Sequence, residues 1–151
     1  MQTEKGDLVR KSQAGEFDVI VHGCNCFCTM GAGIAKTIKQ VFPAAFEADI
    51  ATVAGDKAKL GHYTVANVLV GNKPLAILNA YTQYQWKGRG PHVDYVAVRQ
   101  VFRRVKQEYT GHRIGYPAIG AGLAGGEWPV IAAIIAEELA GENHVFVEWQ
   151  K

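Results

Sequence analysis

The chain has 151 residues, the length of one domain, and we expect a single domain over residues 1–151. Apolar residues make up 48% and charged residues 20% of the chain, a composition that excludes a disordered protein. The net charge of +2 is too small to predict general nucleic-acid binding. No apolar run reaches the ~18 residues of a membrane-spanning helix, and the N-terminus lacks the apolar core of a signal peptide. We therefore expect a cytoplasmic protein that has no membrane partner.

The first part of the chain contains a glycine-rich loop. Residues 1–10 are expected to form an edge strand with a turn at Gly6-Asp7, where Asp7 is either a turn carboxylate or points into a pocket. Residues 19–35, VIVHGCNCFCTMGAGIA, pass from a buried β-branched strand through a tight loop into a helix. Gly31-Ala32-Gly33 then lies at a helix N-terminus, where free N–H groups and the helix dipole attract an anion. The alternative is that these glycines serve packing alone.

The middle of the chain predicts a helix and a hairpin. The helix is expected to begin at Pro43 and to end at Gly55. Its apolar face is expected to contain Phe46, Ile50 and Val53. Residues 62–70 and 75–81 have the composition of two strands, and Gly71-Asn72 between them predicts a hairpin turn.

The last part repeats the pattern of strand, glycine-rich loop and helix. The remaining elements are a polar and aromatic loop over 82–92, an amphipathic helix over 93–109, and strands over 113–117 and 144–149. Between the last two strands lies a second glycine-rich loop, residues 118–128, followed by a helix with Pro129 in its first turn and Gly141 as its C-cap. Strands that alternate with helices predict an α/β fold with helices on both faces of one sheet.

Three cysteines fall at alternate positions, Cys24, Cys26 and Cys28, too close together for ordinary disulfides. With His22 they spell H-x-C-x-C-x-C, which suggests a metal site. Zinc sites instead space paired cysteines by about two to four residues and use a second ligand cluster, so we expect no metal. Cys24 is either a nucleophile or an inert buried thiol.

Two anion-binding loops in one chain favour a diphosphate ligand. In an open sheet such loops meet in a crevice at the carboxyl ends of neighbouring strands. The first loop lacks the G-x-G-x-x-G spacing of ordinary dinucleotide-binding folds, and the chain lacks the Gly-Lys-Ser/Thr of P-loop nucleotide hydrolases.

Three motifs in this order resemble the macro domain, the ADP-ribose-binding fold: Gly6-Asp7-Leu8, Asn25 with MGAGIA at 30–35, and IGAGLAGG at 119–126. The resemblance runs the length of the chain and implies a three-layer α/β fold, a mixed central sheet with helices on both faces, and no cofactor. The segment HGCNC at 22–26 is similar to the ADP-ribose 1″-phosphate phosphatase branch, which includes a yeast enzyme. The longer HGCNCFCTMGAGIA is also similar to the branch that removes ADP-ribose from glutamate or DNA.

The resemblance also implies roles for particular residues. Asp7 would accept a hydrogen bond from the adenine amino group, Asn25 would contact the distal ribose, and Trp149 would lie against adenine, with Phe146 as its competitor. The alternative to ligand binding is a loop-capping amide for Asn25 and core or edge packing for Trp149. The implied ADP-ribose contacts are Asp7, Leu8, Cys24, Asn25, Gly31, Ala32, Gly33, Ile34, Ala35, Ile119, Gly120, Ala121, Gly122, Leu123, Ala124, Gly125 and Trp149.

The sequence departs from the family at two positions. The branch that acts on glutamate or DNA uses a lysine after the middle strands and an aspartate after the second glycine loop, and here Gln83 and Ala124 occupy those places. Lys87 and Glu127 are close by and either replace them or are solvated side chains.

The phosphatase interpretation assigns catalysis to His22 and Asn25, with His22 as the proton-transfer or phosphate-contact group. The alternative for His22 is a buried imidazole bonded to a backbone carbonyl. We expect a hydrolase that removes the 1″-phosphate from ADP-ribose 1″-phosphate. The alternatives are an ADP-ribosyl hydrolase, for which modified protein or nucleic acid is the substrate, and a reader that binds ADP-ribose without catalysis.

Overall fold

The computed structural model describes residues 1–151. The elements in chain order are β1 (Gln2–Gly6), α1 (Leu8–Gln13), β2 (Val19–Cys24), α2 (Gly33–Val41), α3 (Pro43–Ile50), a 3-10 turn (Lys57–Lys59), β3 (Tyr63–Val70), β4 (Lys73–Tyr81), α4 (Tyr95–Tyr109), β5 (Ile114–Tyr116), α5 (Trp128–Glu138) and β6 (His144–Trp149). None of these helices combines the length and the apolar character that crossing a membrane would require.

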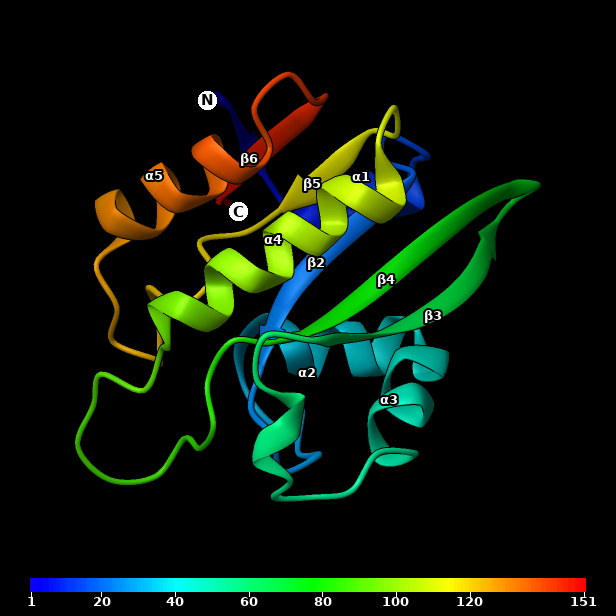
Figure 1. Cartoon of the computed structure of the whole chain (residues 1–151). Coiled ribbons are helices and arrows are strands. Elements are labelled where there is room, and N and C mark those ends of the chain that lie inside the picture. Colours follow the sequence, from blue (N-terminus) through cyan, green and yellow to red (C-terminus); the bar gives the residue numbers. More distant parts are fainter.

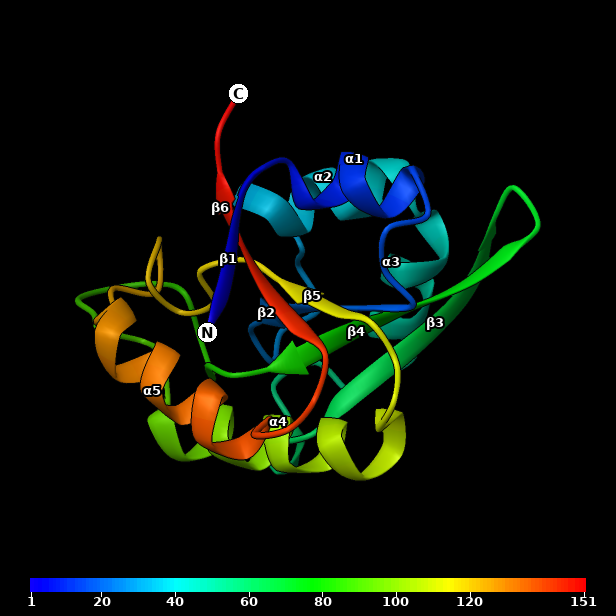
Figure 2. The same ribbon diagram turned by 90° about the horizontal axis from the view of Figure 1, so that it is seen from above.

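The strands form one six-stranded mixed sheet in the order β1-β6-β5-β2-β4-β3. All neighbours run parallel except β3 and β4, which form the predicted antiparallel hairpin around residues 71–72. Seen from above, α4 and α5 cover one face of the sheet and α1, α2 and α3 cover the other (Figure 2). The predicted three-layer α/β fold is confirmed.

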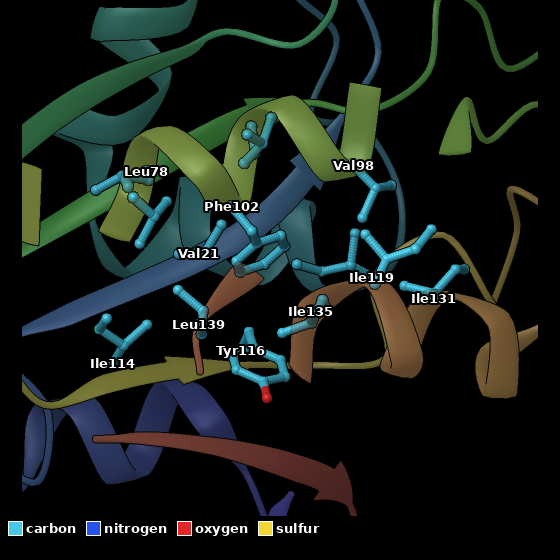
Figure 3. Close-up of a cluster of buried hydrophobic side chains, with 14 of the residues drawn as sticks. Val21, Leu78, Val98, Phe102, Ile114, Tyr116, Ile119, Ile131, Ile135 and Leu139 are labelled. Atoms are coloured by element: carbon cyan, nitrogen blue, oxygen red, sulfur yellow. The ribbon is translucent and has the colours of Figure 1, made fainter. Parts of the chain in front are cut away.

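The face under α4 and α5 is apolar throughout. Alternate residues of β2, Val19 and Val21, point to this face because side chains of a strand alternate in direction. They join a cluster of 19 buried residues that includes Phe102 of α4 and Tyr116 of β5, whose rings meet edge to face at 5.7 Å (Figure 3). This face contributes stability and fixes β5 beside β2.

The opposite face mixes apolar packing with buried polar groups. Ile20 of β2 and Ile77 of β4 belong to its cluster of 16 buried residues. Two residues further along each strand, on the same face, His22 and Asn79 are fully buried and side by side in the strand register. A polar network therefore begins at the end of the strand that leads into the first glycine loop.

Two predicted helix and strand boundaries are wrong. Residues 8–13 are helical instead of continuing the edge strand, because the Asp7 carboxylate accepts the N–H groups of Val9 and Arg10 and so caps a helix. The helix from Pro43 ends at Ile50, since the Thr52 hydroxyl donates to the Asp49 carbonyl and turns the chain. Val53, predicted on the apolar face, is 70% exposed.

The C-terminal end of α5 also differs from the prediction. Leu139 is the C-cap, and Gly141 lies in the turn beyond it with φ of +83°. The left-handed backbone explains the glycine, but it serves the turn into β6 and not the helix end.

Candidate functional site

The two glycine-rich loops leave neighbouring strands at the same edge of the sheet. Strands β2 and β5 pair in parallel, with Val19 opposite Ile114 and Ile20 opposite Gly115, so their carboxyl ends point the same way. The loop after β4 leaves this edge as well (Figure 1). Between the loops lies a cavity of about 940 Å³, the size of a small-molecule site. The predicted meeting of both loops in one crevice is confirmed.

Most of the sequence-predicted contact residues lie in the wall of this cavity. Those in the wall are Asp7, Leu8, Cys24, Asn25, Gly31, Ala32, Gly33, Ile34, Ala35, Ile119, Gly120, Gly122, Leu123, Ala124 and Trp149. Ala121 and Gly125 lie outside it, contrary to expectation. Ala121 packs against the apolar cluster under α4 and α5, and Gly125 faces Pro91 of the neighbouring loop.

The first loop, residues 25–32, is held by hydrogen bonds of its own side chains. Asn25 Nδ2 donates to Thr29 Oγ1 at 2.8 Å, and Asn25 Oδ1 accepts the Phe27 N–H at 2.8 Å. Asn25 is therefore a loop-capping amide and a cavity residue at once. The loop ends at Ala32, the N-cap of α2, which offers no side-chain acceptor. The N-terminus of α2 thus faces the cavity without a side-chain cap, as an anion site requires.

The second loop, residues 117–127, is held by backbone bonds and apolar packing. Gly120 has φ of +74° and accepts the Gly126 N–H at 2.7 Å, which closes the loop. The Ala124 carbonyl accepts the His92 N–H at 2.7 Å and ties the loop to the segment after β4. The following helix α5 begins at Trp128, and the side chain of its N-cap residue Glu127 makes no capping bond.

His22 lies beneath the cavity and not in its wall. Asn79 Nδ2 donates to the Ala45 carbonyl and to Thr64 Oγ1, so Asn79 Oδ1 is the acceptor in its 2.7 Å bond with His22 Nε2. Burial lowers the pKa of His22 to about 4, which keeps the imidazole neutral. The predicted proton-transfer or phosphate-contact role of His22 does not fit this position.

The three cysteines have separate surroundings. The Cys24 thiol lies 3.8 Å from the His22 ring nitrogens, Cys26 donates to the Gln83 carbonyl, and Cys28 donates to the Asp49 carbonyl. Burial raises the pKa of Cys24 well above its ordinary value and that of Cys26 to about 11. A protonated thiol is a poor nucleophile and metal ligand, so the inert reading of Cys24 is favoured.

One end of the cavity lies at β1 and β6. Asp7 caps α1 there and lines the cavity, and Trp149, paired with Gly6 in the strand register, is 70% exposed at the rim. Phe146 instead packs on Trp128 at 4.4 Å between ring centroids, on the apolar face of the sheet. Phe146 therefore cannot take the place proposed for Trp149 against adenine.

The other end lies at β2 and β4. Gln83 and Trp86 follow β4 and line the cavity, and the Trp86 ring meets the Phe27 ring of the first loop edge to face at 5.6 Å. Lys87 and Glu127 are outside the wall. Lys87 lies over the Trp86 ring, with 5.4 Å between Nζ and the ring centroid. Neither side chain occupies the place of the family lysine or aspartate.

Asp49 is a charged residue of the cavity wall that no local sequence pattern predicts. It comes from α3 and reaches the wall because α3 packs across β3 and β4, a tertiary arrangement with no local motif. Burial raises its pKa, against the opposing effect of the Tyr81 hydroxyl and Lys59. Asp7 and Asp49 are the only charged side chains in the wall, which contains no lysine, arginine or histidine. An anion bound here would be held by backbone N–H groups of the loops and by the N-terminus of α2.

Comparison with known proteins agrees with this architecture. A family model described as "Macro domain" matches residues 21–135. An uncharacterised 17.5 kDa protein of Enterobacteria phage T4 is 34% identical over 97% of this chain and 94% of its own.

Two solved structures extend the comparison. A Bacteroides thetaiotaomicron protein of unknown function is 28% identical, with a TM-score of 0.78 over 99% of this chain and 97% of its own. A Thermosipho africanus DarTG structure in complex with ADP-ribose is 18% identical, with a TM-score of 0.73 over 99% of this chain and 42% of its own. The family model covers more than half of the chain, and the solved structures share its fold: this chain belongs to the macro-domain family.

Proposed function

We propose that the protein binds ADP-ribose derivatives in the cavity between its two glycine-rich loops. The observation that carries this proposal is the shared wall: the N-terminus of α2, which has no side-chain cap, and the second glycine-rich loop line one cavity. A pyrophosphate suits such a wall, because it needs several N–H donors and no cationic side chain. The ADP-ribose bound to the Thermosipho africanus protein of the same fold supports the same ligand.

The two ends of the cavity suggest the orientation of the ligand. Adenine would lie at the β1 end, where the Asp7 carboxylate can accept from its amino group and the exposed Trp149 ring can pack against the base. The distal ribose would lie at the β2 and β4 end beside Asn25 and Gln83. Backbone N–H groups of residues 31–35, of Gly120 and of residues 122–124 would face the diphosphate between them.

The proposed reaction is hydrolysis of ADP-ribose 1″-phosphate. Water would attack the phosphorus, the bond from phosphorus to O1″ would break, and O1″ would take a proton, giving ADP-ribose and phosphate. Phosphoryl transfer depends mainly on positioning and on stabilising charge, which backbone donors supply. Asn25 remains the side chain proposed to orient the distal ribose. His22 is given no catalytic role, because it is fully buried and does not line the cavity.

A second candidate is a reader that binds ADP-ribose without catalysis. It is favoured by Gln83 and Ala124, which stand in the cavity wall where the family lysine and aspartate are expected. The third candidate, release of ADP-ribose from protein or nucleic acid, would need a residue set other than Lys87 and Glu127, which are outside the wall.

Phosphate release from ADP-ribose 1″-phosphate tests the enzyme proposal. The wild-type protein should release phosphate, and an Asn25→Ala variant that binds ADP should release at least tenfold less. Calorimetric binding of ADP-ribose without turnover of the phosphate, or of ADP-ribosylated glutamate and thymidine substrates, would support the reader instead. Absence of binding to both ADP-ribose and ADP would end the ligand proposal itself.

A further inference from the structure

Asp49 is a buried carboxylate in the cavity wall. It is 1% exposed, and an aspartate at such a depth normally has partners for both oxygens. One oxygen is paired: the Tyr81 hydroxyl donates to Asp49 Oδ1 at 2.7 Å.

The second oxygen, Oδ2, has no hydrogen-bond or ion-pair partner in the chain. Lys59, whose charge acts on this carboxylate, donates instead to Thr52 Oγ1 at 2.9 Å. The buried side-chain atoms that lack both a partner and solvent contact are the hydroxyls of Tyr63 and Thr82. Oδ2 is not among them, so it remains open to approach, and the space that Asp49 lines is the cavity.

A chain of buried hydrogen bonds holds Asp49 in this position. The Tyr81 hydroxyl lies 3.2 Å from Thr64 Oγ1, which accepts from Asn79 Nδ2 at 3.0 Å. Asn79 also donates to the Ala45 carbonyl at 2.8 Å and so ties α3, which carries Asp49, to β4. The free oxygen is therefore presented by a fixed side chain, which lowers the ordering cost of binding.

Asp49 stands at the end of the cavity opposite Asp7. Asp7 follows β1, the strand at one edge of the sheet, whereas Asp49 bonds Tyr81 at the end of β4, the strand on the far side of β2. Under the orientation proposed above, this is the distal-ribose end of the cavity, which Asn25 also lines.

We propose that Asp49 Oδ2 accepts a hydrogen bond from a hydroxyl of the distal ribose. This inference rests on the proposed function and names a specificity residue within it. An ionised carboxylate is an acceptor only, so it matches a sugar hydroxyl and repels a phosphate at the same point. A 1″-phosphate would accordingly lie away from Oδ2, toward the backbone N–H groups of the first loop.

Calorimetric binding of ADP-ribose and ADP tests this inference, because ADP lacks the distal ribose. Asp49→Ala should weaken ADP-ribose binding about tenfold, the loss of one charge-assisted hydrogen bond, and change ADP binding less than twofold. Asp49→Asn, which keeps the shape and an acceptor for Tyr81, should weaken ADP-ribose binding about threefold. Asp7→Asn at the other end is the matched control and should weaken both ligands alike.

The outcomes separate the inference from the proposed function. Unchanged ADP-ribose affinity in Asp49→Asn would overturn the inference and leave the proposed function standing. Equal losses for both ligands in Asp49→Asn would also overturn it, since they would indicate a general distortion of the cavity. A wild-type protein that binds neither ligand would overturn the proposed function and the inference with it.

Discussion

The two glycine-rich loops have similar sequences, but different forces hold them in place. The first depends on polar contacts: Asn25 bonds Thr29 and Phe27, and the Cys28 thiol donates to the Asp49 carbonyl. The second depends on apolar packing around its glycines. We therefore expect the first loop to respond to lost hydrogen bonds, and the second to added volume.

The glycines form two groups that do not coincide with the two loops. A Cβ added at Gly31 or Gly122 would meet no atom closer than 3.8 Å. A Cβ at Gly120 or Gly126 would lie 2.5 Å from a methyl group of Val93. One sequence signal thus has two physical causes, room for a ligand at the first pair and close packing at the second.

The largest expected effect concerns His22, the buried imidazole near the end of β2, the strand that leads into the first loop. The pKa of His22 is about 4 in the folded chain, whereas an ordinary histidine has a pKa of 6.5, the value expected in the unfolded chain. Between pH 4 and 6.5 the unfolded chain therefore binds a proton at His22 that the folded chain does not bind. Stability contributed by neutral His22 is complete above pH 6.5 and is lost as pH falls toward 4, by up to roughly 3 kcal/mol.

Urea unfolding at a series of pH values measures this loss. His22→Gln keeps an N–H donor for Asn79 but cannot titrate, so its stability should fall less between pH 6.5 and 4 than that of the wild type. If the free energies of unfolding of the two proteins fell equally with pH, His22 would not be the group responsible for the loss.

The second effect tests the apolar support of the second loop. Gly126→Ala should lower the free energy of unfolding by about 2 kcal/mol, because the new Cβ would lie 2.6 Å from the Gly120 carbonyl oxygen and 2.5 Å from Val93 Cγ1. Urea unfolding at pH 7 measures it. This loss of stability should be independent of pH from 5 to 8. A variant as stable as the wild type would contradict the prediction, since it would show that the loop accommodates the added methyl group without cost.

Much of the sheet was predictable because its signals are local. The β-branched run at 19–21 predicts a buried strand, and the Gly71-Asn72 turn between two apolar segments predicts the hairpin. The glycine motifs at 30–35 and 119–126 predicted the cavity, since parallel neighbouring strands must release their loops at one edge.

The predictions that failed concern residues whose position depends on tertiary packing. His22 looks like a catalytic imidazole in sequence, but its burial depends on Asn79, 57 positions away. Asp49 has no local signal, because only the packing of α3 on the sheet brings it to the cavity. The helix cap at Asp7 was not predicted: its carboxylate starts a helix within residues 1–10, which were expected to form an edge strand.

The third effect concerns ligand room in the first loop and rests on the proposed ligand. Gly31→Ala should leave the free energy of unfolding within about 0.5 kcal/mol, since the nearest atom to the new Cβ is the Thr29 carbonyl oxygen at 3.8 Å. ADP-ribose affinity should fall about tenfold, because the methyl group would stand between the diphosphate and the backbone. Calorimetry with ADP-ribose and with ADP should give equal losses, as both ligands carry the diphosphate.

The smallest effect concerns Gly122, the open glycine of the second loop. Gly122→Ala should keep wild-type stability, because a Cβ there meets no atom within 4 Å. Its effect on ADP-ribose affinity should be only about threefold, since the adjacent Leu123 is 81% exposed and this part of the loop can shift outward without breaking buried contacts. Calorimetry measures this loss against Gly31→Ala. A larger loss at Gly122 than at Gly31 would indicate that the diphosphate depends more on the second loop than on the first.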